Sequence, residues 1–113
     1  MTVSHVTTHI LDTSTGKPAS GVPVRLLARL NGGWAELGAG RTDSDGRVKD
    51  IGPEVLDSGT YRLEFVTADY FAARDTESFF PEVVLTFTVD RNEAHYHVPL
   101  LLSPFSFSSY RGS

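Results

Sequence analysis

The sequence contains no cysteine among its 113 residues. This absence excludes disulfide bonds, thiolate nucleophiles and cysteine-ligated zinc sites, and it fits a reducing compartment. A chain of this length can still bury a core without covalent or metal crosslinks. We therefore expect one domain over residues 1–113.

Long hydrophobic runs are also missing from the sequence. The longest apolar stretch is far shorter than the roughly 20 residues that a membrane-spanning helix requires. The first twelve residues, MTVSHVTTHILD, contain neither a basic segment nor an apolar one. We therefore expect no signal peptide and a cytoplasmic location.

Positive charge is scarce and scattered along the chain. Ten Lys and Arg residues against fourteen Asp and Glu residues give a formal net charge of −4. Domains that bind nucleic acid usually carry a basic stripe, which this sequence lacks. We expect neither a nucleic-acid partner nor a membrane partner.

The common catalytic motifs are absent as well. The sequence has no G-x-S-x-G, no H-E-x-x-H and no glycine-rich phosphate loop. Residues 43–46, Asp-Ser-Asp-Gly, resemble the start of a calcium loop, but an EF-hand needs glycine at its sixth position and glutamate at its twelfth. A tight turn is the better interpretation of these four residues.

The sequence does contain many short segments in which apolar and polar residues alternate, and such alternation predicts half-buried β-strands. These segments cover residues 7–11, 22–30, 34–40, 47–48, 60–66, 83–90, 95–102 and 105–108. Turn formers separate them, including Asn31-Gly32-Gly33. Together they predict an all-β fold, an antiparallel β-sandwich.

Residues 67–76 break the alternation and predict one short helix, with Thr67 capping its first turn. Four phenylalanines on predicted strands are expected in the core: Phe65, Phe87, Phe105 and Phe107.

Polar residues at four places are unusual for a simple sandwich: His9, Arg47, the pair His95 and His97, and residues 110–113. Each has an ordinary explanation, because a strand histidine is usually a surface or core residue and an arginine after a turn is usually solvated. Two histidines at i and i+2 can bind a metal, but no third ligand is near in the sequence. Spacing alone supports no more than a β-sandwich.

Five blocks taken together resemble the transthyretin-related proteins and, within them, the 5-hydroxyisourate hydrolases of urate breakdown. The blocks are SHVTTHILD at 4–12, TGKPA at 15–19, TDSDGR at 42–47, YHVPLLLSP at 96–104 and YRGS at 110–113. The YRGS ending and the histidine set separate these hydrolases from the hormone carrier transthyretin, which shares their fold.

The resemblance implies a transthyretin-like (prealbumin-like) sandwich of two four-stranded sheets with one short helix. It also implies a homotetramer, a dimer of dimers, with active sites in the clefts between dimers. No metal and no other cofactor are expected.

The resemblance also assigns functional residues. The implied catalytic residues are His9, Arg47 and His97. The implied substrate-binding residues are His9, Arg47, Tyr110, Arg111, Gly112 and Ser113. The two histidines would act as general base and its partner, in either order, and Arg47 would stabilise the oxyanion. His95 would have a supporting place behind them.

The implied reaction is attack by water on 5-hydroxyisourate, which opens the ring and yields 2-oxo-4-hydroxy-4-carboxy-5-ureidoimidazoline. Two alternatives stay open at this point. One is a transthyretin-like carrier that binds an aromatic ligand without turnover, and the other is an immunoglobulin-like interaction module.

Overall fold

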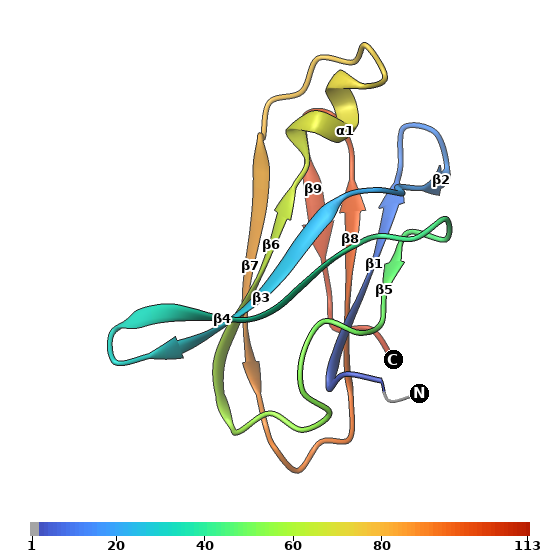
Figure 1. Ribbon diagram of the computed structural model, residues 1–113. Helices are drawn as coiled ribbons and strands as arrows, with labels where there is room; N and C mark the ends of the chain where they lie inside the picture. The colour runs from blue at the N-terminus through green and yellow to red at the C-terminus, as the bar shows by residue number, and fades with distance from the viewer. Residues whose placement is uncertain (1–2) are drawn as a thin grey trace.

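Two β-sheets packed face to face form the protein in the computed structural model, which describes residues 3–113 (Figure 1). The predicted all-β sandwich is confirmed. Met1 and Thr2, which belong to the expected domain and to the segment inspected for a signal peptide, lie outside the described residues.

The first sheet has the strand order β2-β1-β8-β9, and β5 also pairs with β1, on the edge away from β8. Its strands are β1 (Val6–Asp12), β2 (Lys17–Pro18), β5 (Arg47–Val48), β8 (Tyr96–Leu102) and β9 (Phe107–Ser109). The second sheet has the order β4-β3-β6-β7. Its strands are β3 (Pro23–Leu30), β4 (Gly33–Arg41), β6 (Gly59–Val66) and β7 (Glu82–Val89).

The first sheet differs from the sequence prediction in two respects. It has five strands instead of the four that the resemblance implied, because Lys17 and Pro18, which lie between two predicted strands, pair with β1 as the short strand β2. The β1–β8 pair is parallel, with Thr7 opposite His97, whereas the other strand pairs are antiparallel. No local sequence signal reports this pairing, since it joins the two ends of the chain.

The predicted helix is shorter than expected and is capped differently. Helix α1 spans Ala68–Ala72, and the Thr67 side chain makes no capping hydrogen bond. The Thr67 hydroxyl instead donates to the carbonyl oxygen of Phe80 over 3.0 Å, which ties α1 to the segment leading into β7. No helix within residues 3–113 is long and apolar enough to cross a bilayer.

The core lies between the sheets, and its largest fully buried side chains include Phe65 and Phe71. Phe87 packs against this core as expected. The prediction is wrong for Phe105 and Phe107, which are 62% and 36% exposed. The reason is that β9 is a three-residue edge strand paired only with β8, so the Phe107 ring stays outside the core.

A buried carboxylate connects α1 to the first sheet. The hydroxyl of Tyr70 donates to Asp12 Oδ2 over 2.7 Å, and the amide of Ser14 donates to Oδ1 over 2.9 Å. Burial alone would raise the pKa of Asp12, but the hydrogen bonds from Ser14 and Tyr70 outweigh it and lower the pKa below 3.8. Burial and the neighbouring carboxylate raise the pKa of Tyr70 to about 12.

We expect the Tyr70→Phe substitution to lower the free energy of unfolding at neutral pH by about 1.5–3 kcal/mol, the range for a hydrogen bond to a charged group. A carboxylate whose pKa is lowered by folding stabilises the protein above its unfolded pKa and loses that effect as the pH falls. The cost of the substitution should therefore shrink as the pH drops below 3.8, the ordinary value for this carboxyl group. Urea unfolding at neutral and acidic pH measures it.

Tyr61→Phe is the matched control. The Tyr61 hydroxyl donates to a backbone carbonyl oxygen, that of Asp57, and a backbone carbonyl does not change its charge with pH. Its cost should stay constant over the same pH range. Equal pH dependence of the two substitutions would contradict a specific role for the Asp12 carboxylate.

Candidate active site

Three neighbouring strands of the first sheet, β5, β1 and β8, bring the predicted polar residues together. Arg47 on β5 is opposite His9 on β1, and His97 on β8 is opposite Thr7. Side chains alternate along a strand, so Thr7 and His9 point to one face of this sheet. The three-strand register thus gathers residues that are far apart in the sequence.

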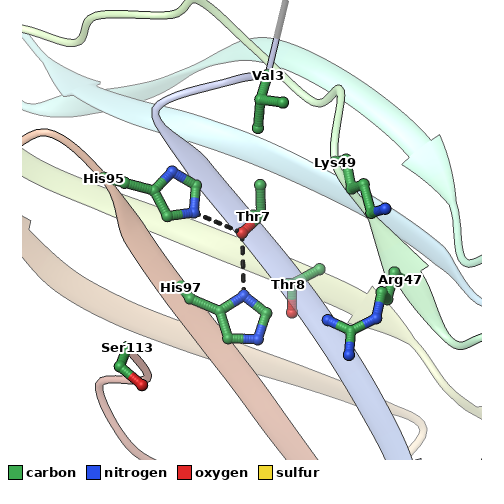
Figure 2. A pocket seen from close by; sticks show the side chains of 8 residues that line it. All are labelled: Val3, Thr7, Thr8, Arg47, Lys49, His95, His97 and Ser113. Atoms are coloured by element: carbon green, nitrogen blue, oxygen red, sulfur yellow. Dashed lines mark hydrogen bonds between the residues drawn. The ribbon is translucent and has the colours of Figure 1, made fainter.

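A pocket of about 370 Å³ opens on this face (Figure 2). The residues that line it are Val3, Thr7, Thr8, Arg47, Lys49, His95, His97 and Ser113. Three of the predicted site residues, Arg47, His97 and Ser113, are therefore at one pocket. His9 is not among the lining residues, but it is close enough to affect the pKa of His97.

His97 has one ring nitrogen engaged and the other accessible. Its Nδ1 lies 2.9 Å from the Thr7 hydroxyl oxygen. Its Nε2 has no hydrogen-bond partner within residues 3–113 and is not buried. Figure 2 shows the ring and the Arg47 side chain both directed into the pocket. Nε2 can therefore meet a water molecule or a ligand there.

The surroundings of His97 favour the neutral imidazole. Burial lowers the pKa of His97 below 6.5, and the positive charge of Arg47 and the nearby rings of His9 and His95 lower it further. At neutral pH the ring is therefore largely unprotonated, which is the form that can accept a proton.

The turn before β5 fixes the position of Arg47. Asp43 Oδ1 accepts hydrogen bonds from the backbone amides of Asp45, over 2.9 Å, and Arg47, over 3.0 Å. Gly46 has a φ of +75°, and a Cβ there would lie 2.5 Å from the Ile10 carbonyl oxygen. The prediction of a tight turn is confirmed, and its role is to deliver Arg47 to the pocket.

Two cationic side chains, Arg47 and Lys49, line the pocket although the chain carries a net charge of −4. Within residues 3–113, no carboxylate lies within salt-bridge distance of Arg47 or Lys49. An arginine without an acidic partner retains its donors for a ligand, and its planar fork suits carbonyl and carboxylate oxygens. The pocket is thus suited to a compact, oxygen-rich or anionic molecule.

The end of the chain packs directly on the His97 strand. The amide of Gly112 donates to the carbonyl oxygen of His97 over 2.7 Å. A Cβ at position 112 would lie 2.8 Å from Cδ2 of the His97 ring. Only glycine allows this approach without moving the imidazole, and it places Ser113 at the pocket.

We expect Gly112→Ala to reduce activity much more than stability, because the added methyl group must displace the His97 ring or break the backbone bridge. The expected loss in kcat/KM is at least about tenfold, on the usual scale for misplaced catalytic groups. Steady-state kinetics and the thermal midpoint measure the two effects. Unchanged kinetics would show that the contact does not position the ring.

Tyr110 and Arg111 are not at this pocket. They line a second pocket of about 330 Å³ next to β7, together with residues such as Phe87 and Val98. The Arg111 guanidinium lies 4.5 Å from the centre of the Tyr96 ring and 3.7 Å from Glu93 Oε2. Tyr96 and His97 are consecutive on β8 and point to opposite faces. A single chain therefore does not bring Arg111 to His97.

Sequence patterns alone did not identify Thr7, Thr8 and Lys49 as pocket residues. Thr7 shares a strand face with His9, which was the one available signal, whereas nothing marked Lys49 beyond its proximity to Arg47. Among residues 3–113, no group of three or more His, Asp or Glu side chains is arranged to hold a metal ion.

The family model of the HIUase/transthyretin proteins matches residues 6–112 of this chain. The chain belongs to the HIUase/transthyretin family. Within this family it is similar to the 5-hydroxyisourate hydrolase of Salmonella dublin, with 48% identity over 93% of this chain and 78% of that protein. It is also similar to the 5-hydroxyisourate hydrolase of Mus musculus, with 45% identity over 97% and 96% of the two chains.

Solved structures of family members confirm the transthyretin-like fold. The Klebsiella pneumoniae 5-hydroxyisourate hydrolase has a TM-score of 0.85 and 36% identity, over 97% of this chain and 100% of that chain. Sea bream transthyretin in complex with thyroxine has a TM-score of 0.90 and 30% identity, over 96% and 94%. The fold is therefore common to a hydrolase and to a transthyretin that binds thyroxine, so the fold alone does not identify the function.

Proposed function

We propose that this protein is an enzyme that hydrolyses 5-hydroxyisourate to 2-oxo-4-hydroxy-4-carboxy-5-ureidoimidazoline in urate breakdown. The similar proteins named 5-hydroxyisourate hydrolase support the substrate and the reaction. The observation that carries the proposal is the accessible Nε2 of a neutral His97 in a pocket that also holds an arginine without an acidic partner. One hydrolase domain over residues 1–113 would perform this reaction.

In the proposed mechanism, His97 Nε2 takes a proton from water as the oxygen attacks a ring carbonyl. The Arg47 guanidinium donates to the oxyanion that develops on that carbonyl. The sequence left open whether His9 or His97 is the general base. The geometry favours His97 as the base, since His97 lines the pocket and His9 is not among the lining residues.

The other predicted residues have supporting roles in this proposal. His9 and Arg47 hold the substrate from the β1–β5 side, while Gly112 and Ser113 limit the pocket beside β8. No metal or other cofactor takes part, and the cytoplasmic location stays a prediction.

We also propose the homotetramer that the family resemblance implied, with the pocket facing a neighbouring dimer. In such an assembly, Tyr110 and Arg111 of one subunit would contact substrate only by reaching the pocket of another. Sedimentation of the purified protein tests this, because a tetramer has four times the mass of the 12.3 kDa chain.

The experiment that tests the enzymatic proposal is incubation of the purified protein with freshly generated 5-hydroxyisourate. The substrate absorbance should decay faster than it does spontaneously, in proportion to enzyme concentration and equally with a chelator present. A transthyretin-like carrier would bind a ligand and leave the decay at the spontaneous rate, which would refute hydrolysis.

A further inference from the structure

We propose that Thr7 and His95 form a proton relay that sets the protonation of His97: the Thr7 hydroxyl joins His97 Nδ1 to His95 Nε2. This inference rests on the hydrolase function proposed above and assigns roles to two residues outside the catalytic set. Both contacts are 2.9 Å long and converge on the same oxygen atom (Figure 2).

The three groups differ in exposure along the relay. His97 is half-buried, Thr7 is buried at 6% exposure, and His95 is exposed to solvent. The Thr7 hydroxyl, on a buried residue, is in hydrogen-bond contact with both rings. His95 can exchange protons with water directly, so the relay connects the pocket to solvent.

The hydrogen count fixes the direction of the bonds. A threonine hydroxyl has a single hydrogen, so with two neutral imidazoles it donates to one ring and accepts from the other. A base at His97 Nε2 needs a lone pair there, so the ring hydrogen must lie on Nδ1 and point to the Thr7 oxygen. The Thr7 hydrogen then points to His95 Nε2, whose ring carries its hydrogen on Nδ1.

The relay also explains how one histidine can act first as base and then as acid. When Nε2 takes a proton from water, the Nδ1 proton moves to Thr7, the Thr7 proton moves to His95 Nε2, and His95 releases its Nδ1 proton to solvent. His97 is then neutral again and holds a proton on Nε2.

Breaking the ring C–N bond reverses these transfers. The Nε2 proton passes to the leaving nitrogen, Nδ1 is refilled through Thr7 from His95, and His95 regains a proton from solvent. Each transfer is balanced by its reverse, so the three residues return to their starting state after one turnover.

The charges around the ring make such a relay useful. The groups that face His97 are Arg47 on β5, His9 on β1 and His95 just before β8, and Lys49 also lines the pocket. A persistent imidazolium beside Arg47 would be repelled by it. Passing the proton through Thr7 and the exposed His95 to solvent avoids that repulsion during the catalytic cycle.

The test compares Thr7→Val, which keeps the shape of the side chain but removes the hydroxyl, with Thr7→Ser, which keeps the hydroxyl. We expect Thr7→Val to lower kcat by at least about tenfold with little change in KM, on the scale of residues that orient a catalytic histidine. Thr7→Ser should retain most of the activity. Nitrogen-15 chemical shifts should show the His97 ring hydrogen on Nδ1 in the wild type and in Thr7→Ser. In Thr7→Val they should show a larger share of the tautomer with the hydrogen on Nε2.

The exposed end of the relay is tested separately with His95→Gln, which does not depend on the tolerance of a buried position. Its kcat should fall and should be partly restored by imidazole buffer, whereas the wild-type rate should not depend on buffer concentration. Wild-type kcat in both Thr7→Val and His95→Gln would overturn the relay while leaving the hydrolase intact. Absence of turnover in the wild-type protein would instead refute the proposed function itself.

Discussion

Replacing His97 with glutamine is expected to lower kcat for 5-hydroxyisourate by about a hundredfold to ten-thousandfold, the range for losing a general acid–base group. Glutamine can still bond to Thr7 but cannot accept a proton from water at neutral pH. KM should change much less, because Arg47 and Lys49 remain to hold the substrate. The decay of substrate absorbance gives both constants.

The pH profile of the wild-type enzyme provides a further check on His97. The lowered pKa of this ring predicts that kcat/KM stays at its plateau down to pH values below 6.5 and falls only when the imidazole becomes protonated. The control for the His97→Gln substitution is Thr86→Ala, at an exposed position of the second pocket. Its kcat, KM and pH profile should equal those of the wild type. Activity of a folded His97→Gln protein equal to that of the wild type would exclude His97 as the base.

Removal of residues 110–113 is expected to reduce turnover to the spontaneous rate while the fold survives. The truncation deletes the Gly112 amide that bonds to the His97 carbonyl, and it deletes Ser113 from the pocket wall. Its cost in stability should be only about 1–2 kcal/mol, since one backbone hydrogen bond, one exposed cation–π contact and one exposed ion pair with Glu93 are lost. Turnover and circular dichroism of the truncated protein measure both effects.

Two single substitutions separate the contributions of residues 110–113 to the two pockets. Arg111→Ala changes only the side that faces Tyr96 and β7, whereas Ser113→Ala changes the pocket side. A large loss in Arg111→Ala would indicate that this residue acts on the pocket of a neighbouring subunit. Full activity of the folded truncated protein would contradict any role of the segment in catalysis.

Most of the fold could be predicted because the strands have a strong period-two pattern and the turns have characteristic residues. The Asn31-Gly32 turn is an example, since both residues adopt the positive φ angles that a tight hairpin needs. The prediction failed where tertiary context decided the outcome. The alternating Phe105 and Phe107 segment lies on a sheet edge, and the Thr67 hydroxyl bonds to Phe80 instead of capping α1.

The site was only partly predictable for a related reason. The family resemblance identified His9, Arg47 and His97 as a set. Their positions relative to one another depend in part on the parallel pairing of β1 with β8, which no local sequence signal reports. That pairing places Thr7 opposite His97 and makes it a pocket residue. Arg111 lies against Tyr96, which points to the opposite face of β8 from His97, and sequence spacing did not reveal this placement.

The central claim is that substrate binds in the pocket beside His97, and the four histidines of the chain can report by NMR where a ligand binds. Urate, a stable planar relative of the substrate, should be added at concentrations that inhibit turnover while the imidazole NMR signals are recorded. The signals of His97 should shift, and those of His5 should not, because both nitrogens of His5 are bonded to backbone groups. Unchanged His97 signals under inhibiting urate, with shifts confined to residues of the second pocket, would show that the reaction takes place elsewhere.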